Sequence, residues 1–296
     1  MLVPLMIVAC GVFARHVLHA PTSVMSALDW CIIRLILPAV VIVNLSSLEF
    51  DHQHLIIVAI AWASMSTSAV AVLIGSKIWR WNRETTLCLL VMVPLANTSF
   101  FGLPVLRALL GESAIAPALV FDQMGSFIAV STYGVVIAAM AQHSKLSPRS
   151  VAMRTLRFPP FLALVVALTL NVMNIELSGQ LLDALKGMAA AMLFATMTSV
   201  GMRIDLPHRS HLSAPLLAGI GYRLGIAPLL VFVVARLLGQ HSIHWEVAML
   251  QCAMPPMISA GILARDAGLP AQLADRMVTY GLLLGSLTVP LWSLAW

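Results

Sequence analysis

The chain of 296 residues is 60% hydrophobic and only 10% charged, and its formal net charge is +5. Soluble domains carry roughly 25% charged residues, so this composition excludes an ordinary soluble protein and predicts an all-α membrane protein embedded in a lipid bilayer. The positive charge indicates no nucleic-acid partner, because Lys and Arg are expected in the cytoplasmic loops of a membrane protein.

Ten apolar stretches follow one another along the chain, and each approaches the roughly 20 residues that a helix needs to cross the hydrocarbon layer. The first has no basic residue before Arg15, so it is expected to be a retained helix rather than a cleaved signal. The ten predicted transmembrane helices are residues 2–18, 26–46, 55–76, 86–110, 115–140, 158–174, 181–201, 212–238, 246–264 and 275–295.

The loops between these stretches differ in charge. Most Lys and Arg residues follow the first, third, fifth, seventh and ninth stretches, and the longest basic loop is residues 143–157. Because basic loops stay in the cytoplasm, both termini are expected outside. The same loop is predicted to link two five-helix repeats, residues 1–142 and 158–296. Since each repeat has an odd number of helices, the second repeat is predicted to be inverted relative to the first.

The fourth and ninth stretches, which take equivalent places in the two repeats, are both interrupted. The fourth contains NTSFFGLP at residues 97–104, and the ninth contains Pro255-Pro256. Proline lacks an N–H and restricts the residue before it, so helix 4 is predicted to open just before Pro104. Backbone freed at this depth persists only where protein or a polar cavity satisfies it. The two breaks are therefore predicted to cross near the midplane and form a binding site.

Polar and helix-breaking residues near these breaks form the predicted site. Each break exposes the N-terminal end of a half-helix, whose free N–H groups suit a carboxylate, so a small organic anion is the expected substrate. The predicted substrate-binding residues are Asn97, Thr98, Ser99, Gly102, Pro104, Asn44, Pro255, Pro256 and Ser259.

A second set of polar residues is predicted to form a coupling-ion or proton site: Asp122, Gln123 and Gln251. A carboxylate within a membrane helix is costly and usually faces a cavity. The role of Asp122 stays open among proton carrier, cation ligand and structural acceptor for helix 4. Arg223 in the eighth stretch is interpreted equally well as a substrate counter-ion or as part of a buried structural pair.

Other classes of membrane protein are less well supported by the sequence. No HExxH, GxSxG or paired acidic motif occurs in the ten stretches, so the protein is not expected to be an enzyme. The four cysteines lie far apart in apolar stretches, which predicts no disulfide framework and no metal site. No cofactor is expected. A receptor has no need of inverted repeats, whereas a channel with broken helices stays an alternative.

The segment PLANTSFFGLPVLRALLGESAIAPALVFDQMG, residues 94–125, resembles the fourth and fifth helices of the auxin efflux carrier family. This family belongs to the bile/arsenite/riboflavin transporter superfamily, and its bacterial members include malate and malonate permeases. Residues 254–292 are similar to the last two helices of the family. The chain departs from the family in carrying Thr98-Ser99 after Asn97, where Gly is frequent. The residues that fit the family pattern are Asn97, Phe100, Gly102, Pro104, Gly111, Glu112 and Asp122.

The resemblance implies the fold of sodium-coupled bile acid transporters, in which ten helices form two inverted repeats around crossed broken helices. It further implies a secondary transporter of the bacterial cytoplasmic (inner) membrane, in which a core moves against a scaffold like an elevator. A proton or sodium ion is the expected coupling ion, and a homodimer through the scaffold is the expected assembly. The alternatives are a sodium-coupled symporter for bile-acid-like substrates, a receptor without transport and a channel.

Overall fold

The computed structural model describes residues 2–19, 21–47, 52–142, 153, 156–157, 159–203 and 212–296. In this part of the chain the regular structure is helical, with one isolated antiparallel bridge between Ala96 and Pro256. Most of the predicted basic linker, residues 143–157, falls outside the described residues. The all-α class predicted from composition is therefore confirmed for the described chain.

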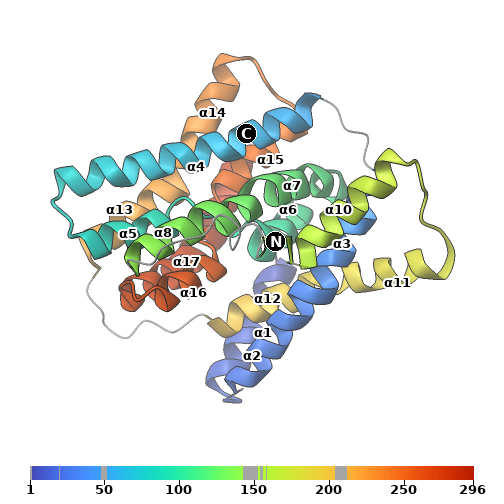
Figure 1. The fold of residues 1–296 in the computed structure, drawn as a ribbon, viewed down its shortest axis with the longest axis horizontal. Coiled ribbons are helices and arrows are strands. Elements are labelled where there is room, and N and C mark those ends of the chain that lie inside the picture. Colours follow the sequence, from blue (N-terminus) through green and yellow to red (C-terminus); the bar gives the residue numbers. More distant parts are fainter. Residues whose placement is uncertain are drawn as a thin grey trace.

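Helices lie in all ten of the predicted stretches (Figure 1). Several stretches contain short turns that interrupt the α-helical bonding pattern, and these turns are labelled η. All of them are π-helical except η3, which is a 3₁₀ turn. The elements are α1 (Leu2–His16), α2 (Thr22–Cys31), η1 (Ile32–Ile36), α3 (Leu37–Leu45), α4 (His52–Ile78), α5 (Arg83–Met92), η2 (Thr98–Gly102), α6 (Leu103–Leu110), η3 (Glu112–Ala114), α7 (Ile115–Phe121), η4 (Asp122–Phe127), η5 (Val130–Gly134), α8 (Val135–Ala141), α10 (Pro159–Val172), α11 (Gly179–Ala190), α12 (Met192–Arg203), α13 (Ala214–Gly221), η6 (Tyr222–Ile226), α14 (Ala227–Leu237), α15 (Ile243–Cys252), α16 (Ile258–Asp266) and α17 (Ala271–Ala295).

Within the described residues, six helical segments are long and apolar enough to cross a membrane. The other predicted stretches hold shorter apolar helices or are broken, so a count of ten crossings stays a prediction. The six segments are Ser23–Leu45, His52–Ile78, Glu112–Ala141, Gly179–Met202, Ala214–Leu237 and Ala271–Ala295.

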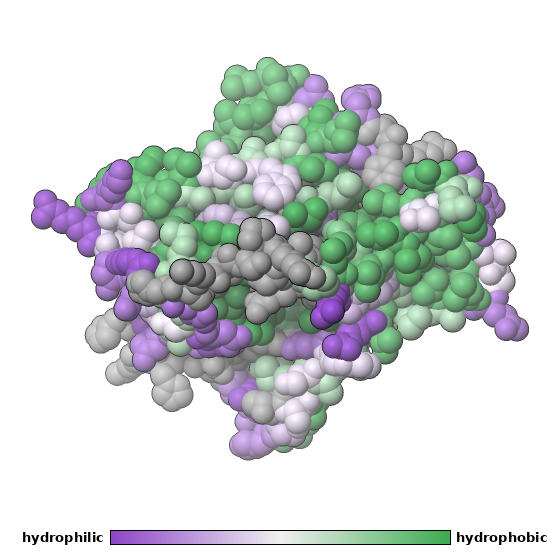
Figure 2. Space-filling view, viewed as in Figure 1, coloured by the Kyte–Doolittle hydropathy of each residue, from purple (hydrophilic) through white to green (hydrophobic). Residues whose placement is uncertain are grey.

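Large apolar side chains face outward on these helices. Leu55 and Ile74 of α4, and Leu287 and Leu291 of α17, are each more than half exposed. Figure 2 shows broad hydrophobic patches on this face of the molecule, including the regions of α10 and α14. A soluble monomer rarely exposes such patches, whereas lipid chains cover them in a membrane protein. The surface therefore agrees with the composition.

The helices form two groups, and Figure 1 shows the first of them, which we call peripheral, toward the lower right of the molecule. The peripheral group contains α1, α2, α3, α10, α11 and α12, in which α1 packs along α12 and α10 packs along α3. The central group contains α4, α5, α8 and α13 to α17; α7 contacts both groups, and α6 packs on α7, α1 and α12. The α1–α12 contact is close and depends on Gly11, since a Cβ atom at this position would lie 2.5 Å from the carbonyl oxygen of Thr198.

Two breaks in the helices meet at the centre of the protein. The first separates α5 from η2 and the second separates α15 from α16. The N–H of Asn97 donates to the carbonyl oxygen of Pro255 at 2.7 Å, and the N–H of Met257 donates to that of Leu95 at 2.9 Å. These two bonds satisfy backbone groups that lipid cannot. The breaks therefore lie against each other, as the sequence predicts.

The fourth stretch opens at a different place from the one predicted. The chain leaves the helix at residues 93–97, around Pro94, and is helical again from Thr98. Gly102 has helical angles, with φ −63° and ψ −55°, and Pro104 lies in the first turn of α6. The prediction that the helix opens just before Pro104 is wrong, because Pro104 lies just after the π-helical turn η2, where the α-helical bonding pattern is already interrupted and a residue without an N–H is tolerated.

Candidate substrate cavity at the helix breaks

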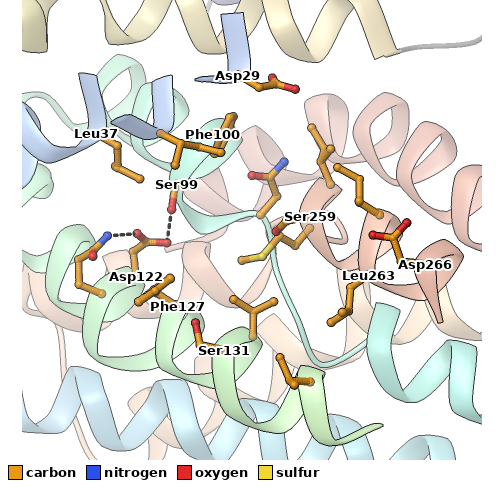
Figure 3. Close-up of a pocket in the computed structure, with 18 residues that line it drawn as sticks. Asp29, Leu37, Ser99, Phe100, Asp122, Phe127, Ser131, Ser259, Leu263 and Asp266 are labelled. Atoms are coloured by element: carbon orange, nitrogen blue, oxygen red, sulfur yellow. Dashed lines mark hydrogen bonds between the residues drawn. The ribbon is translucent and has the colours of Figure 1, made fainter. Parts of the chain in front are cut away.

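A cavity of about 380 Å³ lies beside the two breaks (Figure 3). We call it the break cavity. Its size is within the range of small-molecule sites, and most of its lining is apolar. It is lined by Asp29, Ile33, Leu37, Asn97, Ser99, Phe100, Asp122, Gln123, Phe127, Val130, Ser131, Val135, Met257, Ile258, Ser259, Ile262, Leu263 and Asp266.

Two half-helices begin at the break cavity. Asn97 and Ser99 stand at the start of η2, which continues into α6, and Ile258 and Ser259 stand at the start of α16. The first N–H groups of a helix lack intrahelical partners and carry a partial positive charge. The arrangement therefore offers positive dipole ends to a solute in the cavity, although the lining itself is not basic.

Asp122 is the centre of a hydrogen-bonded cluster in the wall of the cavity. The hydroxyls of Thr98 and Ser99 both donate to Oδ1 of Asp122 at 2.5 Å, and Nε2 of Gln123 donates to Oδ2 at 2.6 Å. Asp122 is buried, and Figure 3 shows the bonds from Ser99 and from the neighbouring amide. An ionised carboxylate accepts all three bonds, which is the chemistry that stabilises a buried charge. Asp122 thus anchors η2 to η4.

Asn97 presents an unused donor at the cavity. Its Oδ1 accepts from the N–H of Phe101 at 3.3 Å. Nδ2 is buried and has no hydrogen-bond partner among the described residues. A buried amide N–H without an acceptor costs free energy, and a ligand oxygen would remove that cost. Asn97 is therefore equipped to bind an acceptor group of a solute.

Gln251 packs behind the cavity against Gly102. Its Nε2 donates to the carbonyl oxygen of Ala118 at 3.3 Å, while its Oε1 is buried without a partner in the described chain. A Cβ atom on Gly102 would lie 2.6 Å from this Oε1. Gly102 is thus required for close approach of the two broken helices rather than for an unusual backbone conformation.

The two prolines of the second break face α17. A Cβ atom on Gly281 would lie 2.5 Å from Cδ of Pro256, and a Cβ atom on Gly285 would lie 3.3 Å from Cδ of Pro255. Neither proline lines the break cavity. They shape the break by leaving the helical region and by packing into the groove that these glycines leave open.

Arg223 in η6 reaches the opposite side of the crossing, away from the break cavity. Its Nε donates to the carbonyl oxygen of Met254 at 2.9 Å, and its two terminal nitrogens donate to those of Gln251 at 3.2 Å and Val93 at 3.5 Å. Arg223 is 1% exposed. Of the two interpretations that the sequence left open, the structure favours a buried structural role, with backbone carbonyls as the partners.

The family described as membrane transport protein matches residues 2–293. The chain belongs to this family, the auxin efflux carrier family. An uncharacterized transporter of Methanothermobacter thermautotrophicus is 24% identical over 229 residues, which cover 74% of this chain and 73% of the relative. An uncharacterized transporter of Methanocaldococcus jannaschii is 21% identical over 300 residues, which cover 98% of this chain and 96% of the relative. The resemblance predicted from the sequence is confirmed, and the protein is a membrane transporter.

The predicted site residues of this transporter divide into three sets. Asn97, Ser99, Asp122, Gln123 and Ser259 line the break cavity. A second set supports the crossing without lining the cavity: Thr98, Gly102, Pro104, Pro255, Pro256 and Gln251. Asn44 belongs to neither set, because it donates from Nδ2 to the carbonyl oxygen of Val40 within α3 and does not line the cavity.

Two further carboxylates of the transporter line the cavity and were not predicted as site residues. Figure 3 shows Asp29 and Asp266 on other sides of the space from Asp122. Oδ1 of Asp29 also accepts from the hydroxyl of Ser199 at 2.6 Å. An acidic residue near the end of an apolar stretch was the available signal for both, but the same pattern is typical of an interfacial residue. Only the packing brings them to the cavity.

Proposed function

We propose that the protein is a secondary transporter that moves a small organic anion, in the form of a monocarboxylic acid, through the break cavity by alternating access. The observation that carries the proposal is the buried, unpartnered Nδ2 of Asn97 beside the N-terminal ends of two half-helices. A carboxylate oxygen is the acceptor that this donor lacks, and helix N-termini favour its charge. We place the protein in a bacterial cytoplasmic membrane with both termini outside.

We propose that the fold is the ten-helix inverted repeat. The support is a symmetry in the helix contacts. Several contacts that helices of residues 1–142 make are also made by the helices that take the equivalent places in residues 158–296. In the peripheral group α1 packs on α12, as α10 packs on α3. At the crossing α6 packs on α7, as α16 packs on α17, and α5 packs on α17, as α15 packs on α7. Two equivalent halves with opposite orientation are expected to give this exchange.

The position of the break cavity supports movement of one helix group against the other. Asp29, Ile33 and Leu37 come from the peripheral group, whereas Asn97 and Ser259 belong to the broken helices of the central region. A solute bound between the groups would change its access when they slide. We therefore propose an elevator-like motion in which the peripheral group is the scaffold.

The charge of the cavity narrows the substrate class. Three carboxylates, those of Asp29, Asp122 and Asp266, line it, and none of the described lining residues is Lys, Arg or His. A dianion would meet repulsion from these carboxylates, and none of the described lining residues is a cation that binds its second charge. A monoanion with an apolar body fits better, because Phe100 and Phe127 supply apolar wall. The same carboxylates favour a zwitterion as the second candidate substrate.

A binding screen tests the proposal. Purified protein is assayed for ligand-induced thermal stabilisation with monocarboxylates, dicarboxylates, zwitterions and bile acids, each with and without sodium. We expect stabilisation by a monocarboxylate, and we expect Asn97→Ala to weaken that binding by about tenfold or more, as loss of a hydrogen bond to a charged group implies. Asn44→Ala is the matched control, because this amide lies outside the cavity lining. Unchanged binding by Asn97→Ala removes Asn97 from the site.

Transport in proteoliposomes separates a carrier from the alternatives. A carrier gives saturable uptake and counterflow, in which unlabelled solute inside drives labelled solute inward. A channel gives flux without counterflow, and a receptor gives binding without flux. Absence of counterflow for every ligand that stabilises the protein would reject the carrier.

A further inference from the structure

The guanidinium of Arg223 lies buried at the crossing of the two broken helices. Three backbone carbonyl oxygens accept from it, those of Val93, Gln251 and Met254, at distances of 2.9 to 3.5 Å. These carbonyls come from two elements that are remote in the sequence. The guanidinium of Arg223 therefore bridges the ends of α5 and α15, the half-helices that precede the two breaks.

The partners of Arg223 lie where a cation is electrostatically favoured. Val93 follows the last residue of α5, and Gln251 and Met254 lie at the end of α15, so the carbonyls belong to helix C-termini. The final carbonyls of a helix lack N–H partners and carry a partial negative charge. In transporters with broken helices, unwound carbonyls and half-helix C-termini are the groups that coordinate sodium ions or protons.

No carboxylate among the described residues forms an ion pair with Arg223. A buried charge is strongly unfavourable unless hydrogen bonds and opposite charge compensate it. For Arg223 the carbonyl dipoles of two helix ends supply the compensation. The guanidinium is thus held by neutral backbone oxygens, which are also the ligands that hold alkali cations at broken helices.

The space next to the guanidinium leaves no room for an additional hydrated ion. The small cavity that Arg223 lines together with Ser64, Pro94 and Ser126 has a volume of about 10 Å³. A single water needs roughly 10–15 Å³ measured this way. The side chain therefore fills the position that the converging carbonyls create.

We propose that Arg223 is a tethered cation, which permanently occupies the cation position of the crossing and makes assembly of the transport site independent of sodium. The consequence for transport rests on the function proposed above, but the occupation of the cation position by Arg223 does not. The charge that holds the crossing together belongs to a side chain of the protein itself. An alkali cation is therefore required neither for folding nor for solute binding. Arg223 is a positioning residue, since it does not line the break cavity.

The test uses the full chain without substrate, so its outcome is independent of the transport proposal. Thermal unfolding of the wild-type protein is compared in sodium chloride and in N-methylglucamine chloride, and we expect equal midpoints. Arg223→Ala is expected to unfold at a lower temperature. Addition of about 10 mM guanidinium chloride is expected to raise its midpoint by about 3 °C or more, by mass action on the folded state. Sodium is expected to raise it less.

Arg236→Ala is the matched control. Arg236 lies on α14 of the same stretch and also donates to main-chain oxygens, those of Ala295 and Trp296, but it is exposed. Guanidinium is expected to leave this variant unchanged, because its carbonyls are open to water. A midpoint that rises equally in both variants would indicate a general salt effect and would overturn the proposal.

Three further outcomes overturn it: a wild-type midpoint that depends on sodium, an Arg223→Ala midpoint equal to the wild type, and a lowered midpoint that guanidinium does not raise. If Arg223→Ala does not fold, Arg223→Lys and Arg223→Gln replace it. The lysine variant, which keeps the charge, is expected to be the more stable of the two, and equal stability would reject a role for charge. The sodium comparison needs no variant at all.

Discussion

The N–H of Asn97 donates to the carbonyl oxygen of Pro255 at 2.7 Å, and this bond fixes the side chain of Asn97 at the point where two helix breaks meet. The bond belongs to a short antiparallel pair in which Ala96 bridges Pro256. Because the pair is made of backbone, it holds the start of η2 without using the side chains that line the break cavity. The backbone pair thus holds the crossing alongside the side-chain bonds of Asp122, and Nδ2 of Asn97 stays without a partner among the described residues.

Gly281→Ala is expected to destabilise the crossing by about 1–3 kcal/mol, because added volume in a packed contact forces neighbouring atoms to move. The new Cβ would lie 2.5 Å from Cδ of Pro256, whose ring is held in the break. Thermal unfolding in detergent measures the effect. Gly225→Ala in η6 is the control, since no atom lies within 4 Å of its Cβ position. Equal midpoints for the two variants would contradict the prediction.

Asp122→Asn tests the charge of the cavity. The amide keeps one oxygen to accept from Thr98 and Ser99, and Gln123 can rotate so that its unpartnered Oε1 accepts from the new amide. The variant is therefore expected to fold. Removal of a negative charge from the wall is expected to tighten monocarboxylate binding by about tenfold, or about 1.4 kcal/mol.

The measurement for Asp122→Asn is ligand-induced stabilisation, with Ser131→Ala as a control that removes a hydroxyl from the lining without changing charge. A zwitterionic substrate predicts the opposite sign, because its ammonium group loses an attractive partner. Weaker binding in Asp122→Asn would therefore reject the monoanion and favour the zwitterion. This experiment decides between the two substrate classes that the cavity admits.

The positions of the helices were predictable from the sequence because length and hydropathy are local properties. The second break was predictable for the same reason, since Pro255-Pro256 interrupts any helix. The first break was misplaced because the π-helical turn η2 accommodates Pro104 within a continuous helix, and the opening at residues 93–97 is stabilised by pairing with the other break. The partners of Arg223 were beyond prediction, since backbone carbonyls leave no signature in residue type.

Gly102 and Gln251 form a pair whose coupling can be measured. Gly102→Ala places a Cβ 2.6 Å from Oε1 of Gln251, so the amide must move and lose its bond to Ala118. We expect a loss of about 1–2 kcal/mol in stability. In Gly102→Ala combined with Gln251→Ala, the clash with Gln251 is absent and only the contact with the carbonyl oxygen of Asn97 at 3.3 Å remains, so the double variant is expected to be more stable than the sum of the single effects predicts. Additive effects would show that the two residues do not interact.

Gly201→Ala is expected to separate the peripheral helices α1 and α12. Its Cβ would lie 2.2 Å from the carbonyl oxygen of Val8, and a backbone atom cannot move aside as a side chain can. The cost is expected to be about 2–3 kcal/mol or more, because close approach of small residues is what holds such a helix pair together in lipid. Gly187→Ala on α11 is the control, as its Cβ position is open. Thermal unfolding compares the two variants with the wild type, and a wild-type midpoint for Gly201→Ala would show that α1 is not packed against α12 in the membrane. If the peripheral group is the scaffold of the elevator, the same variant is also expected to reduce transport more than it reduces solute binding. Gly201 itself does not line the break cavity, whereas it allows the close approach of the scaffold helices α1 and α12.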